Sequence, residues 1–234
     1  MHGPASGAAP SLLRLAALDG AGIAGGPPGI GVTDEQWDLM QGVNVMQHVY
    51  VNRCVVPRMI ARGGGSIVIT ASAAGLLTQV GSFTYAVTKA AAVACAEWLS
   101  VTHGADGIAV NCLCPQAVAT NLGATSAKMR GDAPPAVEIT NPDTPGVAGG
   151  DGVLTAEETA EEVLRCMADG EFLVLPHKEV RTYMERKATD TDRWITGMRR
   201  LNNAFGAQNA FYSRAILMCR CETINLPRQA RDKR

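Results

Sequence analysis

The sequence predicts an α/β fold in which short buried strands alternate with long helices to build a parallel sheet. One observation is the apolar run at 66–70 in "GGGSIVIT", which lacks the polar alternation of a half-exposed strand and is typical of a strand buried on both faces. The other is that two long stretches, 34–60 and 83–103, flank this run and read as helices. Strands separated by helices in this way are the repeating unit of a parallel sheet.

Bulk properties indicate a globular protein with one core. The chain has 234 residues, of which 47% are hydrophobic and 18% charged, and its formal net charge is −1. This composition carries no basic surplus of the kind that nucleic-acid binding requires, so we expect no nucleic-acid partner. No apolar run reaches the roughly 18 residues of a membrane-spanning helix, and the N-terminus lacks the basic and apolar regions of a signal peptide.

We expect the N-terminal part to begin with a disordered segment, which is followed by one strand or helix and then by a long helix. Residues 1–11 are rich in Gly, Pro, Ala and Ser, so we expect them to be disordered. The run 12–18 fits either a strand or a helix. A glycine-rich loop follows, and the 34–60 helix then begins with Thr33 or Asp34 as its N-cap.

The central part predicts a loop at 73–82, the helix 83–103 and a strand at 107–115 that Pro115 closes. The proline- and glycine-containing segment 116–154 is interpreted as a long irregular loop or lid.

The C-terminal part predicts a helix at 155–170, a strand at 171–176 and a final helical segment broken near 189–192. Thr155 and Glu158 have the spacing of a capping box at the start of the first of these helices. The main domain is thus expected to cover 12–200. Residues 201–234 form a basic extension, either poorly packed or a contact surface for a partner or anionic lipid.

The seven cysteines are scattered and odd in number, which fits reduced thiols and a cytoplasmic location. No histidine or second cysteine pair stands at zinc-site spacing from the two Cys-x-Cys pairs, so we predict no metal site.

Ser72, Tyr85 and Lys89 are the candidate catalytic group. Tyr85 and Lys89 are four residues apart and would share one face of the 83–103 helix. An ammonium group beside a phenol favours the phenolate, so Lys89 is expected to lower the pKa of Tyr85 and make it a proton donor or acceptor. Ser72 follows the buried strand at the edge where α/β sheets bind ligands. A Tyr-x-x-x-Lys pair by itself also occurs on ordinary helix surfaces.

With these residues in place, the chain from about 19 to 200 resembles the short-chain dehydrogenase/reductase family. The Asn-Asn-Ala-Gly element of that family is similar to "DGAG" at 19–22, and its active-site asparagine matches Asn44 in "GVNV". Its serine and its Tyr-x-x-x-Lys match Ser72, Tyr85 and Lys89. Its segment after the next strand resembles "CPQAVAT" at 114–120.

The resemblance implies a Rossmann-like three-layer fold, with a parallel sheet and helices on both faces, and hydride transfer between NAD or NADP and an alcohol or ketone. It implies that Tyr85 is the general acid/base, that Lys89 tunes it and binds the nicotinamide ribose, and that Ser72 orients the substrate oxygen. Asn44 would hold a relay water through a helix distortion. The implied cofactor-binding residues are Ala21, Gly22, Tyr85, Lys89, Pro115, Val118 and Thr120. The 116–154 loop would close over the substrate.

One family element has no counterpart, the Thr-Gly-x-x-x-Gly-x-Gly turn that binds the pyrophosphate. The glycine-rich stretch at 20–31 contains two prolines and leads into the helix of Asn44, so it does not replace that turn. We therefore interpret the chain as an N-terminally truncated member that lacks the nucleotide-binding strands. Without these strands, the strand before Gly20 is expected to lie at a sheet edge.

Two functions remain open at this point: an NAD(P)-dependent oxidoreductase for a small organic substrate, and a non-catalytic derivative or interaction module that has lost cofactor binding. Helices 34–60 and 83–103 resemble those that pair subunits in the family, which suggests a homo-oligomer.

Overall fold

The computed structural model describes residues 15–24, 31–130 and 149–208. The predicted disorder at 1–11, part of the predicted lid and most of the basic extension lie outside these described residues.

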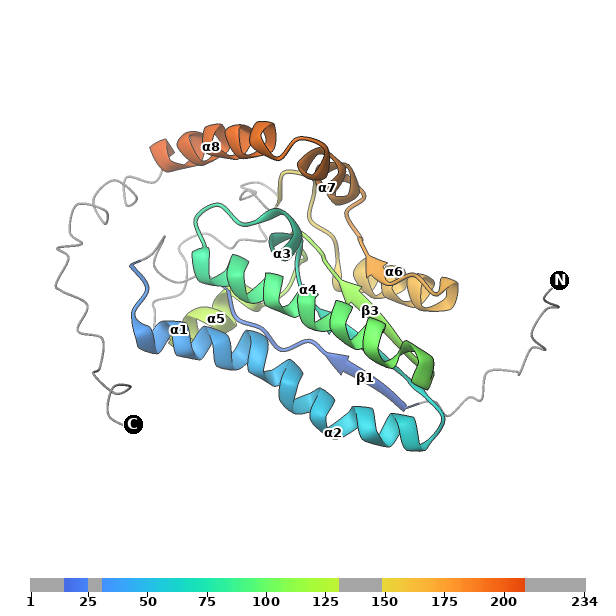
Figure 1. Ribbon diagram of the computed structural model, residues 1–234. Helices are drawn as coiled ribbons and strands as arrows, with labels where there is room; N and C mark the ends of the chain where they lie inside the picture. Colours follow the sequence, from blue (N-terminus) through green and yellow to red (C-terminus); the bar gives the residue numbers. More distant parts are fainter. Residues whose placement is uncertain (1–14, 25–30, 131–148, 209–234) are drawn as a thin grey trace, which may run out of the picture.

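The sheet has four parallel strands in the order β1-β2-β3-β4 (Figure 1). They are β1 (Leu15–Asp19), β2 (Gly65–Thr70), β3 (Ile108–Leu113) and β4 (Leu173–Val174). The described part of the ambiguous run, residues 15–18, therefore belongs to a strand, and the predicted strand at 171–176 is shorter than expected. Among the described strands β1 forms one edge, as expected, with Leu18 78% exposed.

The predicted 34–60 helix consists of three pieces: α1 (Asp34–Gln41), a π-helix η1 (Gly42–Met46) and α2 (Gln47–Ala61). Thr33 is the N-cap, and Gln36 completes a capping box with it. The π-turn is centred on Asn44. A π-turn inside an α-helix is rare and is frequently found at functional sites.

The other helices confirm most of the predicted pattern. The helix predicted at 83–103 is α4 (Phe83–His103), and the capping box of Thr155 and Glu158 begins α6 (Ala156–Asp169). The final segment is broken at Asp190 between α7 (Glu179–Thr189) and α8 (Thr191–Gln208). A short α3 (Ala73–Leu77) lies in the loop predicted at 73–82. The prediction of an irregular lid was wrong at 122–130, which form α5 (Leu122–Arg130).

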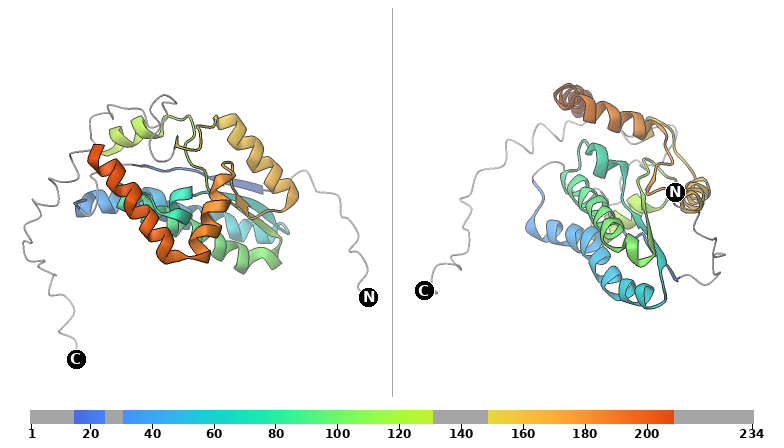
Figure 2. Two further views of the ribbon diagram at one scale, coloured as in Figure 1. Left: turned by 90° about the horizontal axis from the view of Figure 1, so that it is seen from above. Right: turned by 45° about the vertical axis from the view of Figure 1, so that its right-hand side comes forward.

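The helices cover the sheet in layers (Figure 2). α2 and α4 lie side by side on one face, and α6 lies on the other. The first interface buries Ile67, Ile69 and Met59 among the members of the larger core, and the second buries Val68, Val163 and Val174. The three-layer arrangement expected from the resemblance is thus present for these four strands. None of the described helices is both long and apolar enough to span a bilayer.

Candidate active site

The candidate site lies at the carboxyl ends of β1, β2 and β3, where the chain leaves the sheet toward the helices. Ser72 follows β2 and is the N-cap of α3, its Oγ accepting from the Ala74 N–H at 3.1 Å. The same hydroxyl donates to the Pro115 carbonyl beyond β3 at 3.4 Å. Ser72 and Pro115 are therefore joined across the ends of neighbouring strands.

Tyr85 and Lys89 come from the first turns of α4. The Lys89 Nζ lies 5.7 Å from the centre of the Tyr85 ring and donates to the Thr70 carbonyl at the end of β2, at 2.9 Å. Burial raises the pKa of Tyr85, while a hydrogen bond with Ser72 acts in the opposite direction. Desolvation of the phenol therefore outweighs the hydrogen bond with Ser72 that favours the phenolate.

Lys89 is itself almost completely buried, with 3% of its surface exposed. Burial lowers its pKa to about 8, although the nearby Cys114, Asp19 and Cys112 act to raise it. Cys112 lies in β3 and Cys114 directly follows this strand, with 3.7 Å between the two sulfur atoms. The hydrogen bond to Cys114 and burial raise the pKa of Cys112, so this thiol is neutral at physiological pH.

Asn44 joins the π-turn to the loop after β1. Its Oδ1 accepts from the Ile23 N–H at 2.8 Å, and its Nδ2 donates to the Ile23 carbonyl at 2.9 Å. The same Nδ2 donates to Thr88 Oγ1 on α4 at 3.0 Å. Asn44 is fully buried. Both polar groups of the side chain thus have protein partners, and Asn44 fixes the loop after β1 against the helix that carries Tyr85 and Lys89.

Gly22 marks a close approach inside this site. A Cβ at Gly22 would lie 3.3 Å from Lys89 Nζ and 3.7 Å from Asn44 Oδ1. The absence of a side chain at Gly22 therefore lets the backbone of the loop pack against the Lys89 ammonium. Next to it, the Ala21 carbonyl accepts a short hydrogen bond from Gln47.

Two of the predicted cofactor residues, Val118 and Thr120, lie in the segment between β3 and α5. Val118 forms an isolated parallel bridge with Leu154, and Thr120 is exposed, with its hydroxyl accepting from the Leu122 N–H at the start of α5 at 3.4 Å. Thr120 thus contacts the first residue of α5, while Pro115 contacts Ser72.

Sequence reasoning missed a polar cluster behind the Pro115 loop. The Gln116 N–H donates to His177 Nδ1 at 3.2 Å, and the Gln116 side chain donates to Asp151 at 2.7 Å. Tyr183 of α7 donates to the other oxygen of Asp151 at 2.9 Å. This cluster ties the loop after β3 to α7.

It also missed the buried contact between Asp19 and His48. His48 lies one turn beyond Asn44 on the same helical segment, and this spacing is the sequence signal that could have identified it.

Comparisons with known proteins agree with this fold. The family model described as short chain dehydrogenase matches residues 14–131, about half of the chain. The chain therefore belongs to the short-chain dehydrogenase family.

The curated relatives share only part of their length with the chain. Dehydrogenase/reductase SDR family member 4 of Oryctolagus cuniculus is 40% identical over 91 residues, which cover 39% of this chain and 35% of that protein. Oxidoreductase UcpA of Escherichia coli O157:H7 is 31% identical over 168 residues, covering 71% of this chain and 55% of that protein. The chain thus spans well under two thirds of the length of these relatives.

Two solved structures are similar over a longer stretch. A short chain dehydrogenase/reductase from Burkholderia phymatum in complex with NAD has a TM-score of 0.63 at 26% identity, covering 76% of this chain and 67% of that one. A short-chain dehydrogenase from Sphingobium yanoikuyae in complex with NADPH has a TM-score of 0.60 at 21% identity, covering 79% and 64%.

Proposed function

We propose that the chain is an NAD(P)-dependent oxidoreductase that interconverts a hydroxyl and a carbonyl group on a small organic substrate. The observation that carries this proposal is the convergence of Ser72, Tyr85 and Lys89 at the carboxyl end of β2, with Asn44 fixing the facing loop. Membership of the short-chain dehydrogenase family and the NAD and NADPH complexes of the two solved structures support it.

Tyr85 is the proposed proton donor to the carbonyl oxygen. Because burial raises its pKa, the phenol is protonated at neutral pH, which suits carbonyl reduction. Ser72, which hydrogen-bonds with Tyr85, would hold the substrate oxygen at the same place. The cofactor, when bound, supplies the hydride.

Lys89 is the proposed contact to the nicotinamide ribose. It would also take part in the relay that returns a proton to Tyr85. Asn44 would maintain the π-turn from which a relay water reaches Lys89. The Asn44 amide is already occupied by Ile23 and Thr88, so its role in the relay would be to hold the backbone in place. Ala21, Gly22, Pro115, Val118 and Thr120 are the remaining proposed cofactor contacts.

Titration with NADH and with NADPH, followed by nicotinamide fluorescence, tests the proposal. We expect saturable binding of at least one of them and turnover of an alcohol or ketone that Tyr85→Phe lowers by two or more orders of magnitude. Tyr183→Phe, which removes a phenol outside the site, is the matched control. Failure to bind either cofactor at millimolar concentration would favour the non-catalytic alternative.

We also propose that the protein associates with a second copy through α2 and α4. Both helices expose large apolar side chains, among them Tyr50, Trp98 and Val101, the last 85% exposed. Light scattering after gel filtration should give twice the monomer mass, and Trp98→Asp should restore the monomer.

We propose a cytoplasmic location from the cysteines, since those described are all free.

A further inference from the structure

The peptide group that joins Pro115 to Gln116 is held at both of its polar ends. Its carbonyl, on Pro115, accepts from the Ala73 N–H at 2.9 Å and from the Ser72 hydroxyl at 3.4 Å. Its N–H, on Gln116, donates to His177 Nδ1 at 3.2 Å. Because a peptide group is planar and trans, its carbonyl and its N–H point in opposite directions. Ser72 and His177 therefore lie on opposite sides of one rigid peptide group.

His177 lies in the short connection between β4 and α7, and this connection is fixed on both sides. Before it, the Cys114 N–H donates to the Val174 carbonyl at 2.9 Å, so the end of β4 is tied to the residue after β3. After it, the Val180 N–H in the first turn of α7 donates to the His177 carbonyl at 3.1 Å. The histidine itself is 3% exposed. Its imidazole is thus a buried acceptor that the fold holds in place.

The direction of the contact assigns the tautomer of His177. Because the Gln116 N–H is a donor, Nδ1 must be the acceptor, and the proton of the neutral imidazole is on Nε2. Burial lowers the pKa of His177, so the ring is neutral at physiological pH. The carbonyls of Gly152 and Ala117 act in the opposite direction, and so do the carboxylates of Glu179 and Asp151. Burial is the largest of these influences, and it preserves the acceptor at Nδ1.

We propose that His177 is a positioning residue for Ser72, acting through the peptide group between Pro115 and Gln116. The imidazole fixes the direction of the Gln116 N–H, and this in turn fixes the Pro115 carbonyl that holds the Ser72 hydroxyl and the start of α3. The importance of Ser72 for catalysis rests on the proposed function. The contacts from His177 to Ser72 stand on the geometry alone.

The other polar contact of Gln116 does not replace His177. Asp151 accepts from the side-chain amide of Gln116 at 2.7 Å, whereas the backbone N–H has the imidazole as its partner. Without an acceptor on His177, this buried N–H would be left unsatisfied, which is costly enough to turn the peptide group toward another partner. The Pro115 carbonyl would turn with it, because the two groups share one plane.

The experiment follows amide hydrogen exchange in the full chain by 15N NMR and needs no activity. In His177→Leu, which fills the space without an acceptor, the Ala73 amide should exchange about tenfold faster or more, because the Pro115 carbonyl no longer accepts from it. The Ala71 amide is the internal reference, since it donates to the Leu113 carbonyl at 2.8 Å, and its exchange should change clearly less.

His177→Asn is the conservative variant, because its amide oxygen lies near the position of Nδ1 and can accept from Gln116. It should return the exchange of the Ala73 amide toward the wild-type rate. His103→Leu is the matched control, since it removes the imidazole of the His103–Asp106 pair at the last residue of α4 and should change neither amide. His177→Ala replaces His177→Leu if the leucine variant does not fold.

An active enzyme allows a second measurement, a double-mutant cycle on kcat. His177→Leu should lower kcat about tenfold or more, because small misplacements of a group in the site are costly. In the Ser72→Ala background the same substitution should have little further effect, since residues that act through one another are not additive. His103→Leu should leave kcat unchanged in both backgrounds.

A wild-type exchange rate of the Ala73 amide in His177→Leu overturns the proposal. An equal acceleration at Ala71 also overturns it, because the fold as a whole would then have loosened, and so does a failure of His177→Asn to restore the Ala73 amide. Equal losses of kcat with and without Ser72 would show that His177 acts by another route. If exchange changes as expected but kcat does not, the positioning of Ser72 stands and its proposed role in the reaction fails.

Discussion

The Asn44 side chain holds the backbone of Ile23 by both of its polar groups, accepting from the N–H at 2.8 Å and donating to the carbonyl at 2.9 Å. A neighbouring β-strand would hydrogen-bond to the N–H and the carbonyl of Ile23 in the same way. Here a single side-chain amide, at the centre of a π-turn, makes both bonds. It places the loop after β1 beside Lys89, and it is made at the point where the helix departs from α geometry.

Asn44→Ala should lower the free energy of unfolding by about 3 kcal/mol, because it leaves two buried backbone groups of Ile23 without partners. Urea unfolding followed by circular dichroism measures the loss. Asn203→Ala, at an exposed position of α8, is the control and should change the stability by less than about 0.5 kcal/mol. A loss as small as that of the control would mean that water replaces the amide at Ile23.

Gly75→Ala should destabilise the protein by about 1–3 kcal/mol, because a Cβ at this position of α3 would lie 2.4 Å from the Lys89 carbonyl of α4. The helices would have to separate at the turn that presents Lys89. Gly197→Ala in α8 is the matched control, since a Cβ there meets nothing within 4 Å. It should stabilise α8 by up to about 1 kcal/mol. Thermal melts of the two variants should therefore shift in opposite directions.

The elements that sequence predicted well are those with local causes. The length of α4, the capping box of Thr155 and Glu158 and the break at Asp190 depend on residues a few positions apart. The π-turn was expected only as a helix distortion implied by the resemblance. The pair Asp19–His48 and the Gln116–Asp151 contact join residues 29 and 35 positions apart, so no local pattern names both partners, although the spacing of His48 from Asn44 pointed to one of them. α5 was missed because the proline- and glycine-containing segment around it was read as one loop.

Removal of Lys89 should change how stability depends on pH. The Lys89 pKa is lowered from 10.5 to about 8, so between these values the unfolded chain binds more protons than the folded chain. Stability therefore rises with pH in this window, and the benefit is lost as pH falls through about 8. Relative to Lys89→Met, the wild type should gain up to about 3 kcal/mol between pH 8 and 10.5. Urea unfolding at several pH values tests this, with Lys128→Met as the control for removing an exposed lysine. Parallel curves for the wild type and Lys89→Met would contradict the buried ammonium.

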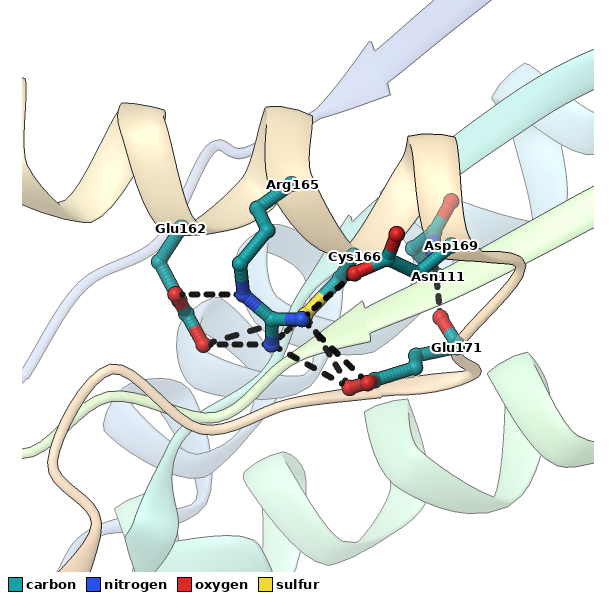
Figure 3. A network of polar contacts seen from close by, with 6 residues as sticks. All are labelled: Asn111, Glu162, Arg165, Cys166, Asp169 and Glu171. Carbon is teal, nitrogen blue, oxygen red and sulfur yellow. Dashed lines mark hydrogen bonds and ion pairs between the residues drawn. The ribbon is translucent and has the colours of Figure 1, made fainter.

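The Arg165 guanidinium joins α6 to the chain entering β4 (Figure 3). It contacts Glu162 at 2.9 Å and Asp169 at 2.7 Å on its own helix, and Glu171 at 3.2 Å beyond it. The Glu171 carbonyl in turn accepts from Asn111 of β3 at 2.6 Å. Single exposed ion pairs contribute little, but one guanidinium shared among three carboxylates forms a network.

Arg165→Met should lower the melting temperature at low ionic strength, and the difference should shrink in 1 M NaCl, because salt screens exposed charges. The difference should also fade in acid. Hydrogen bonds with Arg165 lower the pKa values of Glu162 and Glu171, so their stabilising effect is present above the ordinary carboxyl pKa and is lost as pH falls through the lowered values. Arg58→Met, on the exposed side of α2, is the matched control for removing an arginine. A melting difference that persists unchanged in high salt and at acid pH would show that Arg165 acts through the packing of its alkyl chain, since packing does not depend on the charges of its three partners.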